Sequence, residues 1–285
     1  MLPLERPERL TATTAAAKLS PVQGLRAIYG EPLFWLFPVA TMLVSMLSFI
    51  VFAAPLTWLA ARDPEGLRRF RIQSRPPREQ QLVGPSVTSW LVNSAWAFAG
   101  VVAAWPLLRL TGVHAGPLPR WWLIVGQIVF FVYLDDVLYY GLHRTMHRPW
   151  LYKRIHGWHH RIVTPWAITG NYMHPIEFTA TASVALIGPL LVGAHVLTLW
   201  LWFAFRQWEA AEGHSGYDFP WTLTHFLPGN DGARHHDWHH ARVKGNYAGF
   251  LTWMDRLCGT YARGYAEDLG MRTAASSRSR SARTG

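Results

Sequence analysis

The stretch FWLFPVATMLVSMLSFIVFAAPLTWLAA, residues 34–61, decides the fold class of this chain, because it contains no charged side chain. An α-helix rises 1.5 Å per residue, so about 20 apolar residues cross the roughly 30 Å hydrocarbon core of a bilayer. The stretch is long enough to span that core with some tilt. It therefore predicts a retained membrane-spanning helix, which Pro55 would kink or end.

Apolar regions recur along the chain, at about residues 33–61, 87–110, 121–142 and 175–207. The second and third are separated by TGVHAGPLPR, a Pro/Gly turn that predicts a hairpin. Gly188 and Pro189 interrupt the fourth and would let it fold back as two short helices. We therefore expect an all-α integral membrane protein with about four apolar transmembrane regions, the last a short helical hairpin.

Charge supports the same class and suggests an orientation. The chain is 50% hydrophobic and 15% charged, with a net charge of +10. Its basic residues fall mostly between the apolar runs, among them Arg75 and Arg78, and in the tail. The positive-inside rule predicts this for cytoplasmic segments, so we expect no nucleic-acid partner. The loop 62–87, the segment 143–174 and everything after about 208 should share the cytoplasmic side, whereas the side of the N-terminus stays open.

Three histidine clusters fall on that side. HRTMH places His143 and His147 at i and i+4, and HGWHH and HDWHH each place three histidines at i, i+3 and i+4. On helices each set would project from one face. One such pair is commonplace, but three sets predict a metal site, and eight rings are too many for one ion and suit two. These candidate ligands are His143, His147, His156, His159, His160, His236, His239 and His240.

We expect the dimetal site to lie in a cytoplasmic, histidine-rich helical cap. Other polar residues are expected around it. His174 and His214 flank the fourth apolar region and are further candidate ligands or neighbours. Metal-bound imidazoles usually donate their second N–H to a carboxylate or carbonyl, and an exposed loop charge is the alternative for Asp237. The candidate orienting carboxylates are Asp136, Asp237, Glu177 and Glu209.

The remaining histidines and the single cysteine are not expected to be metal ligands. His235 should point off the face of its helix, where it would be a neighbour of the ligands or exposed. His114, His195 and His225 have no ligand spacing, so we expect loop, helix-packing and loop roles for these three. Cys258 alone can form neither an internal disulfide nor a thiolate cage, which restricts a metal to nitrogen or oxygen ligands.

The chain resembles the fatty acid hydroxylase and sterol desaturase superfamily, and within it most nearly the C-4 methylsterol monooxygenases. The likeness covers roughly residues 135–261 and is carried by DDVLYYGLHRTMH, LYKRIHGWHH, NYMHPIEF, EGHSGYDFPW, GARHHDWHH and GNYAGFLTWMDRLCGTY. The expected organisation is an N-terminal segment (1–32), transmembrane helices with a basic loop (33–134), a catalytic region (135–261) and a basic, disordered tail (262–285).

The resemblance implies two non-haem irons held by the box histidines, O2 as co-substrate, and electrons from NAD(P)H through a separate cytochrome b5-like or ferredoxin-type donor. It implies stepwise oxidation of a sterol C-4 methyl group in a membrane lipid. Desaturation or another regiochemistry is the nearest alternative, and a non-catalytic zinc-binding membrane protein is the alternative from another class. The membrane would be the inner membrane of a bacterium or the endoplasmic reticulum of a eukaryote, with the active site on the cytoplasmic face.

Overall fold

The structure, a computed structural model, describes residues 20–73 and 80–268. Within these ranges the chain is helical, and its extended pairing is limited to two isolated bridges, Arg71 with Tyr217 and His114 with His195. The all-α expectation is confirmed. The expectations for residues 1–19, for Arg75 and Arg78, and for the tail beyond residue 268 fall outside the described residues.

Three helical segments are long and apolar enough to cross a membrane, as expected for the first three apolar regions. The first consists of α2 (Pro32–Phe34), a π-helical turn (Trp35–Val39) and α3 (Ala40–Arg62). The others are α4 (Val83–Leu108) and α5 (Trp121–Met146). Pro38 has no N–H to donate and lies inside the π-helical turn. Pro55 lies within α3 and does not end it.

The fourth apolar region forms the expected hairpin, of α7 (Pro175–Leu191) and α8 (Val196–Gly213), but its break lies elsewhere than expected. Gly188 and Pro189 are helical, and the turn follows at residues 192–195. A Cβ at Gly188 would lie 2.7 Å from Cδ1 of Phe131, so this glycine allows α7 to approach α5 closely. Its role is helix packing and not chain reversal.

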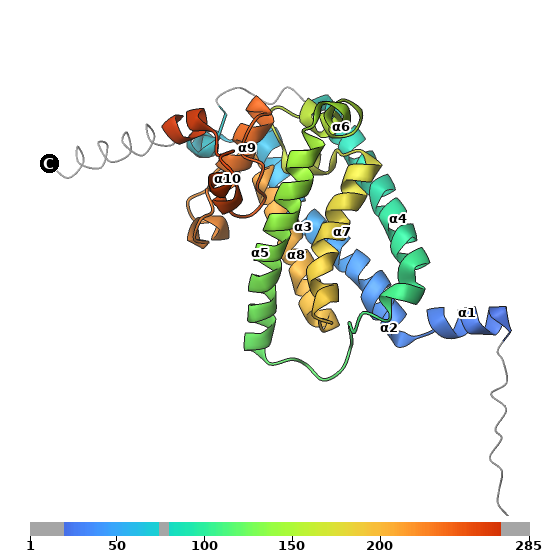
Figure 1. Cartoon of the computed structure of the whole chain (residues 1–285). Coiled ribbons are helices and arrows are strands. Elements are labelled where there is room, and N and C mark those ends of the chain that lie inside the picture. Colours follow the sequence, from blue (N-terminus) through green and yellow to red (C-terminus); the bar gives the residue numbers. More distant parts are fainter. Residues whose placement is uncertain (1–19, 74–79, 269–285) are drawn as a thin grey trace, which may run out of the picture.

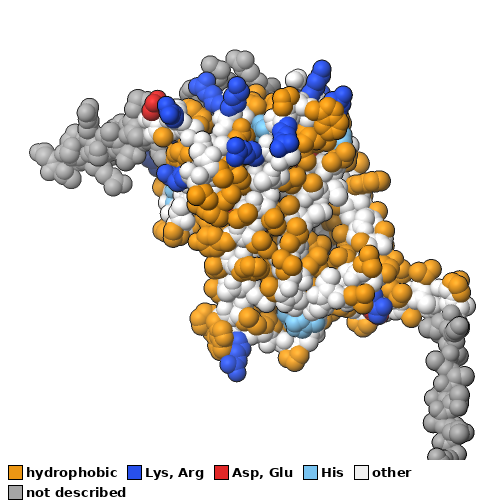
Figure 2. Space-filling view, in the orientation of Figure 1, with side chains coloured by type: hydrophobic (Ala, Val, Ile, Leu, Met, Phe, Trp, Pro, Cys, Tyr) orange, Lys and Arg blue, Asp and Glu red, His pale blue; other side chains and the backbone are white. Residues whose placement is uncertain are grey.

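The long helices form one bundle, in which α3 packs against α8 and α5 against α7 (Figure 1). Their outer faces expose large apolar side chains such as Leu47, Trp96 and Val129. Figure 2 shows hydrophobic side chains along the body of the bundle and most visible Lys and Arg at one end. Apolar outer faces bounded by basic residues are what a bilayer requires of spanning helices.

Short elements cover the basic end of the bundle and form the cap (Figure 1). They include α6 (Pro149–Arg154), a 3₁₀ turn (His156–Arg161), a second 3₁₀ turn (Ala167–Asn171), α9 (Ala233–Arg242) and α10 (Trp253–Leu257). Further 3₁₀ turns are Glu65–Phe70, Gln80–Leu82 and Leu223–Phe226. Helix α1 (Pro21–Tyr29) projects sideways at the opposite end of the bundle.

Candidate metal centre

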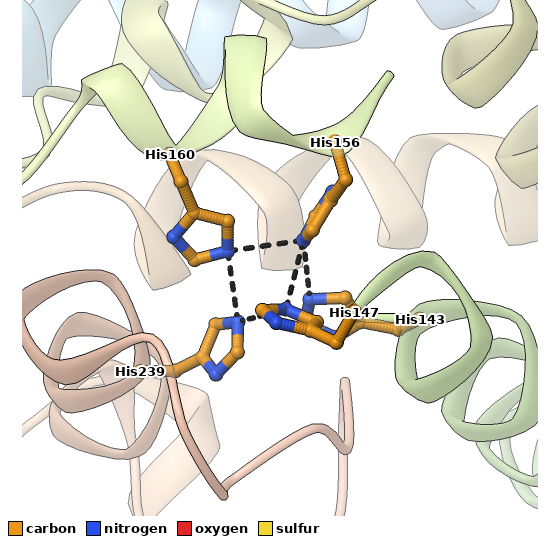
Figure 3. Close-up of side chains that lie close together, drawn as sticks. All are labelled: His143, His147, His156, His160 and His239. Atoms are coloured by element: carbon orange, nitrogen blue, oxygen red, sulfur yellow. Dashed lines mark hydrogen bonds between the residues drawn. The ribbon is translucent and has the colours of Figure 1, made fainter. Parts of the chain in front are cut away.

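The cap brings nine histidines together in two groups, each suited to one metal ion. The five-histidine group contains His143, His147, His156, His160 and His239, and the four-histidine group contains His159, His214, His236 and His240. Within each group the candidate ligand atoms lie within 4.8 Å of one another. Figure 3 shows the five-histidine group, whose rings point toward one another from α5, from the 3₁₀ turn that begins at His156, and from α9.

The two groups divide the sequence boxes in a way that the face argument did not predict. The HGWHH box folds as a 3₁₀ turn and not as an α-helix, and it directs His159 away from the group of His156 and His160. The HDWHH box lies on α9, where His239 joins the five-histidine group while His236 and His240 join the other. Two of the three boxes therefore contribute to both groups.

The Nε2 atoms form the inner surface of both groups. In the five-histidine group, Nε2 of His156 lies 3.2 Å from that of His143, 3.0 Å from that of His147 and 3.0 Å from that of His160. In the other group, Nε2 of His236 lies 3.0 Å from that of His214 and 3.2 Å from that of His240. Each group thus has a shared nitrogen-lined centre.

The Nδ1 atoms point outward, mostly to acceptors. Nδ1 of His143 and of His239 contact the carbonyl oxygens of Tyr247 and Gly245, both at 2.7 Å. His156 contacts the Glu177 carboxylate at 2.6 Å. His214 and His240 contact the carbonyl oxygens of Ala210 and Ile162 at 2.8 and 2.7 Å. A carbonyl only accepts, so in the neutral rings it fixes the proton on Nδ1.

This tautomer pattern tests whether a metal fits. When Nδ1 of both His143 and His156 carries the proton, their Nε2 atoms present two lone pairs 3.2 Å apart and cannot hydrogen-bond to each other. A cation between them would turn that repulsion into ligation. The buried donor set is all imidazole, which suits iron, zinc and copper, and therefore fits a bound metal.

Burial keeps these rings neutral, as ligation demands. Desolvation lowers the pKa of His147 to about 3, with neighbouring His143 adding to the effect. Burial lowers the pKa of His214 to about 4, against the opposing hydrogen bond to Ala210. Desolvation and neighbouring histidines likewise lower the pKa of His159 and His240 well below the ordinary value. These rings can bind a metal without first losing a proton near pH 7.

The loop after α9 supplies two of the carbonyl acceptors. Val243 ends the helix at φ 67°, a left-handed conformation that costs a β-branched residue strain. Buried Asp255 holds the loop by accepting the N–H groups of Tyr247 and Ala248, at 2.9 and 2.8 Å. The strained turn and its carboxylate anchor direct the Tyr247 carbonyl toward His143. Sequence reasoning missed Asp255 and this role of the loop, although both lie in stretches that carry the resemblance.

The four expected carboxylates have different positions. Glu177 does contact an imidazole, that of His156. Asp136 instead accepts the N–H groups of Phe250 and Leu251, at 3.0 and 3.1 Å, and so holds the loop that carries Tyr247.

Asp237 and Glu209 bond to other side chains. Asp237 accepts from Gln73 at 2.9 Å and is buried, so it is not an exposed loop charge. Glu209 accepts from Arg206 at 3.1 Å and bonds to no imidazole in the described residues.

Three histidines near the boxes differ in whether they belong to a ligand group. His214 lies in the four-histidine group, whereas the structure leaves His174 outside both groups. Nδ1 of His174 accepts the Ile176 N–H and caps helix α7. His235 points off the ligand face, as expected, and its Nε2 lies 3.3 Å from buried Asp255.

Gly170 is a contributor that sequence reasoning missed. A Cβ at this position would lie 2.7 Å from Nδ1 of His214 and 2.8 Å from its Cγ. A side chain here would therefore displace the imidazole from the four-histidine group. No sequence signal marks this glycine, since its role depends on a ring that is distant in the chain.

A cavity of about 580 Å³ runs inside the bundle and reaches this centre. Its lining comes mainly from α3, α4, α7 and α8 and is mostly apolar. His214 and His236 of the four-histidine group line it, whereas the described lining includes no member of the five-histidine group. The volume is in the range of binding sites for small organic ligands. One group thus borders an apolar chamber within the membrane-spanning part.

The part of the chain that holds the histidine boxes is similar to known proteins. Residues 128–260 match the model of the fatty acid hydroxylase family. Very-long-chain aldehyde decarbonylase GL1-11 of Oryza sativa subsp. indica is 42% identical over 164 residues, covering 56% of this chain and 62% of that protein. Methylsterol monooxygenase 2-2 of Arabidopsis thaliana is 40% identical over 164 residues, with the same coverage.

Methylsterol monooxygenase 2-1 of Arabidopsis thaliana is 37% identical over 176 residues, covering 56% of this chain and 65% of that protein. The chain spans less than two thirds of the length of these relatives. No solved structure matches it. The family match covers all three histidine boxes, and residues 128–260 of this chain therefore belong to the fatty acid hydroxylase family.

Proposed function

We propose that this chain is an O2-dependent iron enzyme that hydroxylates a C–H bond of a membrane lipid. The observation that carries the proposal is the contact between the four-histidine group and the apolar cavity, through His214 and His236. A lipid entering from the bilayer would meet the metal centre there without passing through water. The nine grouped histidines are the proposed ligands of two irons.

Bound iron would supply the redox chemistry toward O2 that an imidazole cluster lacks. One oxygen atom enters the lipid and the other leaves as water, with two electrons from NAD(P)H and two protons completing the balance. The chain itself positions the ligands through Glu177 and the backbone carbonyls, as metal-site partners generally do. Its apolar cavity walls keep water from the reacting carbon.

A sterol is the proposed substrate, oxidised stepwise at its C-4 methyl group. Support comes from relatives that are named methylsterol monooxygenases. A second candidate is a very-long-chain aldehyde, because relatives of similar identity carry that substrate in their names. Desaturation remains the nearest alternative chemistry, since both reactions begin with removal of a hydrogen from the lipid.

Electrons are proposed to come from a separate acidic carrier that docks on the cytoplasmic face of the cap. Exposed basic side chains on and beside α6, such as Arg148, Lys153 and Arg154, complement such a partner. The positive-inside rule supports the cytoplasmic placement.

The test begins with anaerobic purification of the full chain and measurement of its metal content. About two irons per chain are expected from the two ligand groups. Incubation with a reductase system, ¹⁸O₂ and 4,4-dimethylsterol should then give an alcohol or acid that carries ¹⁸O. Recovery of a new double bond alone would replace hydroxylation by desaturation, and tightly held zinc without reactivity toward O2 would overturn the enzyme proposal.

A matched pair of variants checks the ligand assignment. His236→Ala should lower the iron content and abolish product formation, because this ring belongs to the group that borders the cavity. His195→Asn should retain both, since His195 caps α8 at the end away from the metal centre and asparagine can also serve as a cap. Equal iron content in the two variants would contradict the role of His236.

A further inference from the structure

Polarity is distributed unevenly along the cavity. Its lining follows α4 from Trp90 near the cap to Leu108 at the far end, a distance of about 27 Å along a helix. The far end is lined by apolar residues such as Phe37 and Leu190. The acidic and basic side chains of the described lining are Glu209 and Arg206, on the part of α8 that leads to His214.

Arg206 presents unused donors at this end. Its Nη1 lies 3.1 Å from Oε2 of Glu209 and 3.6 Å from Oδ2 of Asp135. Its side chain is 11% exposed, and its Nε and Nη2 donate no hydrogen bond within the described residues. Leaving such donors unpaired in an apolar chamber is unfavourable. An acceptor on a bound molecule would satisfy them.

Glu209 offers a matching acceptor. Oε2 bonds to Arg206, whereas Oε1 has no hydrogen-bond partner in the described structure. Oε1 lies 3.9 Å from the position that a Cβ at Gly213 would take, and Cδ2 of His236 lies 4.0 Å from the same position. The free carboxylate oxygen and the ring of a proposed metal ligand thus border the same position at Gly213.

Tyr139 connects the same corner to the other metal group. Its ring centroid lies 5.6 Å from Cζ of Arg206 and 5.3 Å from the ring centroid of His143. Tyr139 thus lies between Arg206 and His143 of the five-histidine group. Among the hydroxyls of the lining residues, that of Ser183 already donates to the carbonyl oxygen of Thr179, whereas those of Thr41 and Thr179 have no partner among the described residues but are buried.

We propose that Arg206 and Glu209 form a polar anchor that binds an oxygen atom of the lipid and so places a neighbouring carbon at the metal centre. A hydroxyl would donate to Glu209 and accept from Arg206, and a carbonyl would accept from Arg206. The substrate class is then a lipid whose oxidised carbon lies at, or one or two bonds from, an oxygen-bearing carbon. The proposal rests on the proposed function and adds the residues that select the reacting position.

The test measures equilibrium binding of radiolabelled probes to the purified full chain in detergent, without reductant, so that no turnover is needed. One pair of probes is 4,4-dimethyl-5α-cholestan-3β-ol and 4,4-dimethyl-5α-cholestane. The other pair is octadecanal and octadecane. The oxygen-bearing member of at least one pair should bind about tenfold more tightly, as a hydrogen bond to a charged group predicts. The pair that shows the preference identifies a sterol or an acyl chain as the source of the oxygen.

Variants then distinguish loss of the polar anchor from general damage to the structure. Glu209→Gln should weaken binding of the hydroxylated sterol probe about tenfold and leave the hydrocarbon probes unchanged. Arg206→Lys, which keeps the charge opposite Asp135, should reduce the preference for either oxygen-bearing probe. Glu212→Gln is the matched control, because Glu212 is buried on the same helix but bonds to Thr224 and does not line the cavity.

The anchor is overturned if the wild type shows no preference within either pair, or if Glu212→Gln reduces the preference as much as Glu209→Gln does. Lipid oxidation with no binding preference would refute the anchor alone. A binding preference in a protein that takes up no iron would refute the proposed function and leave the anchor standing.

Discussion

Glu177→Gln should weaken metal binding at the five-histidine group without unfolding the chain. Oε1 of Glu177 accepts the Nδ1 hydrogen of His156 at 2.6 Å, and the two side chains are only 7% and 1% exposed. Water therefore cannot replace the contact. The carboxylate fixes the ring so that Nε2 faces the metal, and it makes that nitrogen a stronger ligand.

The size of the effect follows from the change of acceptor. A hydrogen bond to a charged group contributes about 1.5–3 kcal/mol and a neutral one about 0.5–1.5 kcal/mol. The Gln amide oxygen can still accept, so the loss is about 1.4 kcal/mol, a factor of about ten in affinity. Glu177→Ala removes the acceptor and should approach the hundredfold limit seen for such partners.

The assay is competitive titration of the purified chain with Co²⁺ or Fe²⁺ against a chelator. One of two binding steps should weaken in Glu177→Gln, while the step that belongs to the four-histidine group stays unchanged. Glu212→Gln makes the same chemical change in a carboxylate bonded to Thr224 and should alter neither step. Unchanged affinity in Glu177→Gln, or equal weakening of both steps, would refute the reasoning.

Three further outcomes follow from the structure. Gly170→Ala should lower the metal content from about two ions to about one, because the new Cβ would displace the His214 ring. Elemental analysis measures the metal content, and retention of both ions would contradict the close contact between residue 170 and His214. Asp136→Ala should cost about 3 kcal/mol and lower the thermal midpoint, since two buried N–H groups lose their acceptor, whereas Asp136→Asn should cost less. Metal uptake at pH 6 should release few protons, as measured by calorimetry in buffers of different ionisation enthalpy. Burial lowers the pKa of His214 to about 4 and that of His147 to about 3, so both rings are already neutral at this pH. Release of most of a proton per imidazole would refute this.

Patterns that depend on local spacing were predictable from the sequence. The apolar runs predicted the three long helices and the final hairpin, and the spacing of His143 and His147 placed both rings at the end of α5. Roles that depend on distant neighbours were not predictable. In the sequence Gly188 looks like a helix breaker. In the structure it is helical, and the ring of Phe131 leaves no room for a side chain at this position.

The partners of the imidazoles show the same limit. Carboxylates were the natural candidates, and Glu177 is one, but several Nδ1 atoms contact backbone carbonyls such as those of Ala210 and Ile162. Every residue has a carbonyl group, so no residue type marks an acceptor of this kind. Only the fold shows which carbonyl faces which ring.

The division of two boxes between the two groups couples the two halves of the metal centre. On α9, His236 and His240 lie one helical turn apart in one group, and His239 between them belongs to the other. The spacing between the two centres is therefore constrained by α9 and by the 3₁₀ turn of the HGWHH box, each of which supplies ligands to both groups. A shift of α9 would move ligands of both groups together, so a substitution that displaces this helix should weaken both metal-binding steps. Loss of one outward partner, such as Glu177, should weaken one step alone, and this contrast distinguishes a shared scaffold from two independent sites.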